Sequence, residues 1–232
     1  ARGTWRVFAA DVRATPDAAR RRFAWTLTWG LAGGVALVLA LCWGARRMVE
    51  AGRLDWEAAW LRGLEGGPMS FSTALWAESP GNSVFIIPVV LLAAILCARA
   101  RRPLRALAVL ASFFMLDLIV LAGWTAWDRA RPDVIAGGIA APGFHAYPSG
   151  HIAQMVSAYG LFVWMWLRGS GSWGERVFGV LFWIGVTAVV ALARLRLGSH
   201  WPSDIAAGAA VGLFWLGVTT TALRRGEALG GR

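Results

Sequence analysis

The sequence contains no lysine and only two cysteines, and both shortages narrow the classes of protein to which it can belong. Cys42 and Cys97 lie within hydrophobic segments, at a spacing that suggests neither a disulfide framework nor a set of metal ligands. No internal repeat or low-complexity tract stands out either. We therefore expect both cysteines to be packing residues.

Charged residues are also scarce. They make up 16% of the 232 residues, whereas hydrophobic residues make up 57% and tryptophan alone occurs 15 times. This composition is too apolar for an ordinary soluble domain of this length. It predicts an all-α, polytopic membrane protein, with residues 1–232 forming a single membrane-embedded helical-bundle domain.

Six stretches of the sequence are nearly free of charge. With their flanking turns, each approaches the roughly 20 residues that a helix needs to cross a bilayer. The first begins only at residue 23 and lacks a clear cleavage site, which favours a span over a signal peptide. We predict six transmembrane helices, at 23–45, 79–98, 106–127, 152–167, 177–193 and 205–223.

Arginine supplies all 23 basic residues, and fifteen of them fall on one side of the predicted topology. They occupy the basic segment 1–22, the two loops on the same side and the C-terminus. The positive-inside bias then places both termini in the cytoplasm of a bacterial cell, with the protein in its cytoplasmic membrane. The net charge of +10 orients the protein and attracts anionic lipid, so a nucleic-acid partner is unnecessary.

Segment 48–78, between the first two spans, mixes tryptophan and leucine with charged residues. It could lie flat as an amphipathic helix on the outer leaflet. An ordinary polar loop with tryptophans at the membrane interface fits the same residues.

Three polar fragments interrupt this hydrophobic chain: Arg131-Pro132, Pro148-Ser149-Gly150-His151, and Arg194 followed by His200 and Asp204. Alternation of the six spans puts the end of the third, the start of the fourth, the end of the fifth and the start of the sixth on one face. All three fragments lie at those places. The topology therefore predicts one shared site at the outer membrane surface.

The residue types in these fragments suit a phosphate group. Ser149 is placed to cap the fourth span, Gly150 allows close approach of the backbone, and Pro202 suits the first turn of the sixth span. Two helix N-termini directed at one pocket offer free N–H groups and a positive dipole end. Arg131 and Arg194 add permanently charged guanidinium groups for the phosphate oxygens.

Two histidines in such a pocket suggest two roles. His200 and Asp204 are four residues apart, so the carboxylate can accept a hydrogen bond from one imidazole nitrogen and leave the other as a nucleophile. His151 is then available as the acid.

The three fragments together resemble the signature of the type 2 phosphatidic acid phosphatase superfamily, whose membrane members are six-helix lipid phosphatases and phosphotransferases. This resemblance implies that His200 attacks phosphorus to form a phosphohistidine while Asp204 orients it. It further implies that His151 protonates the leaving group and that Arg131, Arg194, Ser149 and Gly150 bind the phosphoryl group. No metal and no cofactor are implied.

The sequence departs from the family pattern at two positions. Trp124 stands where the pattern has a lysine, and Ala193 stands where it has a serine before Arg194. Arg129 and Arg196 are candidates to replace the missing positive charge.

Two further polar residues lie outside the signature. Asp117, in the third predicted span, is expected to make a buried hydrogen bond or ion pair, with a proton or substrate path as the alternative. His145 is expected to be a loop residue or to lie at the substrate entrance.

The function predicted from these residues is hydrolysis of a lipid phosphate or pyrophosphate at the outer face of the membrane. Undecaprenyl pyrophosphate, phosphatidylglycerophosphate, phosphatidate and lipid A phosphate are the family's candidate substrates, and the partners are the lipid substrate and membrane lipids. A lipid-to-lipid phosphotransferase with the same site is one alternative. A non-catalytic lipid-binding or transport homologue, which lost its chemistry with the lysine, is another.

Overall fold

The computed structural model describes residues 2–67, 69–135, 138 and 146–230. These residues form helices joined by turns and irregular segments, without a β-strand among them. In chain order the helices are α1 (Arg2–Ala14), α2 (Asp17–Glu50), α3 (Trp56–Arg62), α4 (Phe71–Ala77), η1 (Ser79–Gly81), α5 (Ser83–Arg99), α6 (Pro103–Ala126), α7 (Gly150–Gln154), η2 (Met155–Tyr159), α8 (Gly160–Leu167), α9 (Trp173–Arg196) and α10 (Pro202–Gly230).

Five helical stretches are long and apolar enough to cross a membrane, and they coincide with five of the six predicted spans: Asp17–Glu50, Phe71–Arg99, Pro103–Ala126, Trp173–Arg196 and Pro202–Leu229. The remaining stretch runs continuously through α7, η2 and α8, but a π-helical turn at η2 interrupts its α-helical geometry. The all-α prediction is therefore confirmed, whereas the count of six spans stays a prediction.

Local sequence signals account for several helix ends. Pro103 and Pro202 each stand at the first position of a long helix, where the missing N–H is not needed. Ser172 caps α9 by accepting a hydrogen bond from the N–H of Glu175 at 3.3 Å. Gly198 follows α9 with a φ of +65°, a conformation that favours glycine, and so lets the chain turn sharply into α10.

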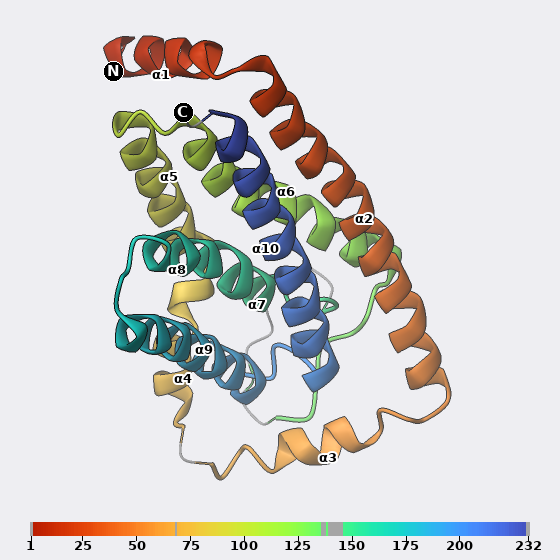
Figure 1. Cartoon of the computed structure of the whole chain (residues 1–232). Helices are drawn as coiled ribbons and strands as arrows, with labels where there is room; N and C mark the ends of the chain where they lie inside the picture. The colour runs from red at the N-terminus through yellow and green to blue at the C-terminus, as the bar shows by residue number, and fades with distance from the viewer. Residues whose placement is uncertain (1, 68, 136–137, 139–145, 231–232) are drawn as a thin grey trace.

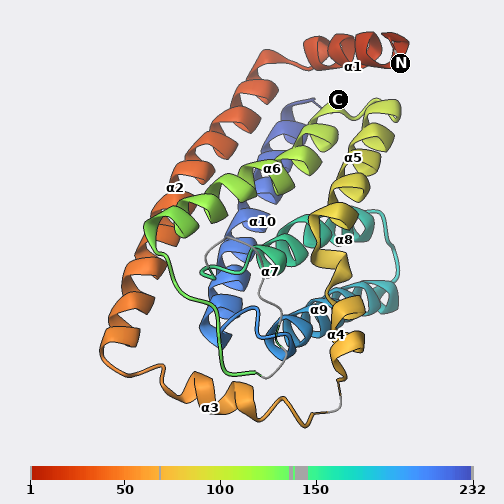
Figure 2. The same cartoon turned by 180° about the vertical axis from the view of Figure 1, so that it is seen from behind.

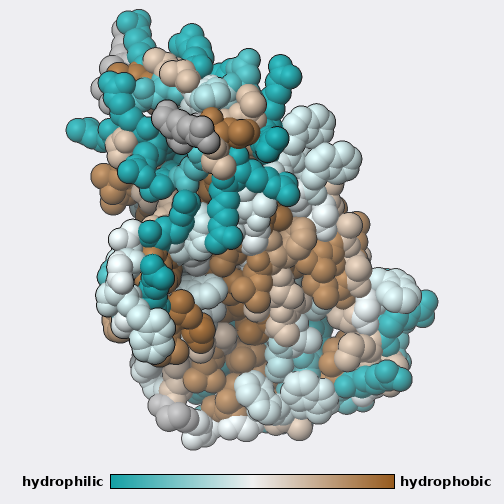
Figure 3. Space-filling model, viewed as in Figure 1, coloured by the Kyte–Doolittle hydropathy of each residue, from teal (hydrophilic) through white to brown (hydrophobic). Residues whose placement is uncertain are grey.

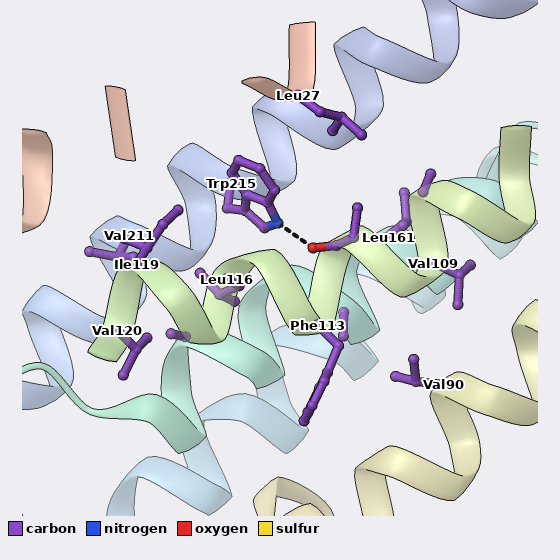
Figure 4. Close-up of a cluster of buried hydrophobic side chains, with 14 of the residues drawn as sticks. Leu27, Val90, Val109, Phe113, Leu116, Ile119, Val120, Leu161, Val211 and Trp215 are labelled. Carbon is purple, nitrogen blue, oxygen red and sulfur yellow. Dashed lines mark hydrogen bonds between the residues drawn. The ribbon is translucent and has the colours of Figure 1, made fainter. Parts of the chain in front are cut away.

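The hydrophobic core lies where α10 meets α2 and α6. Trp215 of α10 is fully buried there, and its indole N–H donates a hydrogen bond to the carbonyl of Ala111 at 2.9 Å. Leu116 and Ile119 of α6 and Val211 of α10 lie in the same cluster (Figure 4). Burying the indole with its N–H paired avoids the cost of an unsatisfied donor.

Both termini, the C-terminal end of α5 and the N-terminal end of α6 lie at one end of the molecule, and α3 lies at the opposite end (Figures 1 and 2). The continuous helix α7–η2–α8 packs against α10, and it lies with α9 on the side of α10 away from α2 (Figures 1 and 2). Segment 48–78 contributes the short helices α3 and α4 at the end away from the termini. Within it, Glu57 and Leu61 are fully buried.

Close approach between α10 and the α7–η2 segment depends on the lack of a side chain at Gly212. A Cβ atom at this position would lie 2.7 Å from the carbonyl oxygen of Ala153 and 2.8 Å from the Cβ of Val156. Both distances are shorter than real Cβ contacts, so an added methyl group would push the two helices apart. Because α7 and α10 both carry residues of the predicted site, this contact also sets the site's geometry.

We expect Gly212→Ala to lower the free energy of unfolding by about 1–3 kcal/mol, because the helices cannot separate without losing packing. Gly217→Ala on the same helix is the matched control, since its Cβ would meet nothing within 4 Å. Better helix propensity should leave the control at wild-type stability or up to about 1 kcal/mol above it. Thermal unfolding in detergent measures both; equal stabilities would contradict the packing argument.

Candidate active site

A cavity of about 330 Å³ opens between the ends of several helices, at the place where the sequence fragments were expected to meet. Its walls include two histidines, two arginines, two carboxylates and the amide of Asn82. The lining residues are Glu78, Gly81, Asn82, Ser83, Phe113, Asp117, Trp124, Arg131, Gly150, His151, Gln154, Arg194, Ser199 and His200.

His200 stands in the short connection between α9 and α10, with only 2% of its surface exposed. Its Nδ1 lies 3.4 Å from Oδ2 of Asp204, longer than the usual 2.7–3.2 Å of such a hydrogen bond. Oδ2 instead accepts a hydrogen bond from the N–H of Trp201 at 2.8 Å. The carboxylate therefore faces Nδ1, and the ring nitrogen turned away from it is Nε2.

A buried guanidinium group holds the other carboxylate oxygen of Asp204. Nη1 of Arg129 donates to Oδ1 of Asp204 at 2.5 Å and to the hydroxyl of Ser203 at 2.6 Å. Its Nη2 donates to Glu57 of α3 at 2.7 Å, and Glu57 also accepts from the N–H of Ser203 at 2.6 Å. This network ties segment 48–78 to the first turn of α10.

Ser149 does not cap α7, contrary to the prediction from the sequence. It occupies the N-cap position, but its hydroxyl makes no capping bond and is buried without a hydrogen-bond partner among the described residues. The backbone fixes it instead, because its N–H donates to the carbonyl of Asp204 at 3.0 Å. Gly150 begins α7 and lines the cavity beside it.

Arg131 and Arg194 reach the cavity from different parts of the chain. Nη1 of Arg131 donates to the carbonyl of Ser199 at 2.5 Å, whereas Nη1 of Arg194 binds Glu78. Burial and then the nearby charge of Arg194 lower the pKa of Arg131. Two cations held this close repel one another, and an anion between them would relieve that repulsion.

Four buried polar atoms of the residues that line the cavity have no hydrogen-bond partner in the described part of the chain: Nε of Arg194, the hydroxyl of Ser199, Oε1 of Gln154 and Nδ1 of His200. Buried polar groups are normally paired, so such atoms gathered around one cavity indicate a place for a polar ligand.

His151, the predicted acid, lies in the first turn of α7 and lines the same cavity. Its Nε2 lies 2.9 Å from the amide oxygen of Asn82. Because a carbonyl oxygen only accepts, this contact places the imidazole proton on Nε2. The sequence thus correctly predicted that His151 and His200 share a pocket.

Neither candidate for the missing lysine charge lines this cavity. Arg129 is bound to the two carboxylates behind Asp204, and Nε of Arg196 donates to the carbonyl of Met69 at 3.1 Å. Trp124 itself lies in the cavity wall, and its indole N–H donates to the carbonyl of Pro148 at 3.0 Å. The lysine position is thus occupied by a residue that supports the Pro148–Gly150 turn and adds no charge.

Asp117 makes the buried hydrogen bond expected of it, accepting from the amide of Gln154 at 2.7 Å. It also lines the cavity. His145, for which the sequence suggested a loop or entrance role, lies outside the described residues.

Sequence reasoning missed three residues that contact the predicted machinery: Glu57, Glu78 and Asn82. All three lie between α2 and α5, in a stretch whose spacing carries no motif. One available signal was the shortage of acids, 13 against 23 arginines, which makes any acid near the outer face a candidate partner for Arg129 or Arg194. Across the described ranges, no group of three His, Cys, Asp or Glu residues could hold a metal ion.

The chain matches one protein-family model and one solved structure. The model of the PAP2 superfamily matches residues 105–226, slightly more than half of the chain. The crystal structure of the first transmembrane PAP2 type phosphatidylglycerolphosphate phosphatase from Bacillus subtilis has the same fold, with a TM-score of 0.70 at 15% identity. The alignment covers 85% of this chain and 97% of that one. No curated protein matches the chain.

We expect Glu57→Gln to lower the free energy of unfolding by roughly 3–5 kcal/mol, because it leaves the buried Arg129 with one carboxylate instead of two. Asp55→Asn, an exposed carboxylate two residues earlier, is the matched control and should change stability by less than about 0.5 kcal/mol. Denaturation in detergent compares the two variants. A loss no larger than the control's would show that the network does not stabilise the fold.

Burial lowers the pKa of His200 to about 4, because the charged imidazolium would lose its hydration. We therefore expect a neutral ring throughout pH 5–7. Between about pH 6.5, where an unfolded histidine titrates, and pH 4, the unfolded chain binds more protons, so stability falls as pH falls.

Imidazole ¹⁵N NMR of the ligand-free protein measures this pKa directly. The chain has only 3 histidines, and His200→Gln assigns the resonance. A titration midpoint near 6.5 for His200 would contradict the buried, neutral state.

Proposed function

Because the chain belongs to the PAP2 superfamily and has the fold of a transmembrane phosphatase, we propose that it removes phosphate from a lipid phosphate or pyrophosphate, with His200 as nucleophile. The supporting observation is that the wall of one cavity holds buried donors without a partner among the described residues, namely the hydroxyl of Ser199 and Nε of Arg194, with the unpaired hydroxyl of Ser149 next to the lining residue Gly150. A phosphoryl group has the acceptor oxygens that these donors need. Its charge also suits the pair Arg131 and Arg194.

The first step is transfer of the phosphoryl group to the enzyme. Nε2 of the neutral His200 attacks phosphorus while the bond between phosphorus and the lipid oxygen breaks. Asp204 stabilises the positive charge that develops on the ring, and Arg129 holds that carboxylate in place. His151, protonated to the imidazolium before this step, gives one proton to the departing oxygen and becomes neutral, so the lipid leaves neutral at that atom.

The second step regenerates the enzyme. Neutral His151 takes a proton from water and returns to the imidazolium, while the oxygen of that water attacks the phosphohistidine. The phosphorus–nitrogen bond breaks, orthophosphate leaves, and His200 returns to its neutral form. In both steps Arg131 and Arg194 offset the charge on the equatorial oxygens, which is the main contribution a protein makes to phosphoryl transfer.

The proposed topology has six spans in a single domain, counting α7–η2–α8 as the fourth. Hydrophilic side chains gather over the end that carries the termini, and hydrophobic ones cover the middle of the face in Figure 3. The positive-inside rule assigns that arginine-rich end to the cytoplasm. The cavity then opens on the periplasmic or extracellular side of a bacterial cytoplasmic membrane.

For the substrate we propose a bacterial lipid whose phosphate lies at the outer surface and whose tail enters laterally between helices. Phosphatidylglycerophosphate, the substrate class in the name of the Bacillus protein, joins undecaprenyl pyrophosphate, phosphatidate and lipid A phosphate as candidates. With Trp124 at the lysine position, binding of the phosphate relies on Arg131, Arg194 and the serine hydroxyls.

We expect His200→Ala to reduce phosphate release from every accepted lipid by roughly a thousandfold or more, since loss of a nucleophile removes the covalent route. Thr220→Ala, whose hydroxyl bonds only to carbonyls of its own helix, is the control and should keep wild-type turnover. The measurement is orthophosphate release across a panel of lipid phosphates in detergent, with unfolding curves recorded for both variants.

The same assay distinguishes the alternatives. Undiminished turnover in folded His200→Ala would overturn the mechanism. Phosphate that appears on an added acceptor lipid, with none released in its absence, would identify a phosphotransferase. Binding of the lipids without release or transfer would identify a non-catalytic homologue.

A further inference from the structure

A second concave site, which shares no lining residue with the active-site cavity, lies between α2 and α10. It is a groove of about 1150 Å³. Arginines line one end of the groove, and aromatic and aliphatic side chains line the other. The residues are Arg21, Arg22, Trp25, Thr26, Trp29, Gly30, Leu213, Phe214, Gly217, Val218, Thr221 and Arg225.

The polar end of this groove has three positive charges and no negative one. No acidic residue lines it, and Arg21, Arg22 and Arg225 form no ion pair with any residue that the structure describes. Nη1 of Arg225 lies 3.4 Å from the hydroxyl of Thr26, which draws this arginine to the α2 side. Nearby acids are already paired, because Asp17 binds Arg20.

The apolar end is shaped by aromatic rings and a glycine. Trp25 and Trp29 stack with ring centroids 6.3 Å apart and remain 58% and 69% exposed. Phe214 and Leu213 of α10 form the facing wall, and Gly217 leaves open space between them, since a Cβ there would meet nothing within 4 Å. Tryptophan rings of this kind favour the boundary between headgroups and acyl chains.

From this arrangement we propose that the groove is a binding site for an anionic phospholipid, separate from the catalytic cavity. The lipid phosphate binds the guanidinium groups of Arg21, Arg22 and Arg225, and an acyl chain lies against Trp29 and Phe214 past Gly217. Charge complementarity selects the anionic headgroup, because basic residues near an anionic lipid surface are attracted to its phosphates. The apolar half selects a molecule with a chain rather than a soluble phosphate.

The first experiment is native mass spectrometry of the detergent-purified protein titrated with phosphatidylglycerol or phosphatidylcholine. We expect the triple variant Arg21→Gln, Arg22→Gln, Arg225→Gln to raise the dissociation constant for phosphatidylglycerol at least tenfold. The wild type should retain phosphatidylglycerol in preference to phosphatidylcholine.

The matched control removes the same charge from the same end of the molecule, outside the groove: Arg6→Gln, Arg13→Gln, Arg99→Gln. All three arginines are exposed, and we expect wild-type affinity. Equal losses in the two triple variants would mean that only net charge matters, and this would overturn the proposal. Equal retention of both lipids by the wild type would overturn it as well.

A further variant tests the apolar half without changing charge. Gly217→Phe fills the open space with a ring, so it should weaken phosphatidylglycerol binding at least tenfold while Gly217→Ala has little effect. Soluble glycerol 3-phosphate carries the headgroup charge without chains and should not displace the lipid. Unchanged binding in folded Gly217→Phe, or displacement by glycerol 3-phosphate, would overturn the proposal. None of these measurements uses turnover, so they stand apart from the proposed phosphatase activity.

Discussion

The buried guanidinium group of Arg129 is the interaction on which the rest of the site depends. It binds Asp204 on one side and Glu57 on the other, so one side chain connects α10 to α3 across most of the sequence. All three groups are nearly inaccessible to water, where an unpaired charge would cost several kcal/mol. The fold must therefore keep them together. In doing so it fixes the carboxylate that faces His200.

The same requirement, that buried charges be paired, applies to the charged residues around the cavity. Arg131 and Arg194 line the cavity together with Glu78 and Asp117, whereas Arg129, Glu57 and Asp204 are buried behind it. Arg129 is fully occupied, whereas Arg194 keeps Nε without a partner and repels Arg131. The positive potential that remains is thus directed at the cavity. A phosphoryl group there would complete a set of bonds that the described residues leave open.

The arginines of the groove between α2 and α10 have different surroundings from those of the active-site cavity. At the catalytic end each arginine meets a carboxylate or a carbonyl, and the protein itself satisfies most of the charge. At the groove the arginines meet no acid among the described residues, and the stacked, exposed tryptophans Trp25 and Trp29 line the same groove. A protein with no lysine thus uses arginine in two ways, as a fixed structural cation and as an open anion site.

Some features of the site could be predicted from the sequence, and others could not. Five of the six predicted spans, and the predicted meeting of Arg131, His151, Arg194 and His200 at one cavity, agree with the structure, because hydropathy sets the spans and their alternation sets which ends lie together. The capping role given to Ser149 was wrong. Its hydroxyl is free because a backbone bond to Asp204 holds the turn instead. Arg129 and Arg196 were candidates for the same role, yet neither lines the cavity.

The sequence by itself determined that the chain is an all-α membrane protein and indicated which polar residues meet at one cavity, since these follow from composition, periodicity and short motifs. Only the tertiary structure decided which acids serve which arginines. Glu57, Glu78 and Asn82 belong to a stretch between α2 and α5 with no recognisable spacing, and they reach Arg129, Arg194 and His151 through contacts between residues 69 to 116 positions apart. Packing, and the free-energy cost of leaving a buried charge unpaired, determine which residues this far apart in the sequence become partners. Neither can be predicted from a short stretch of sequence.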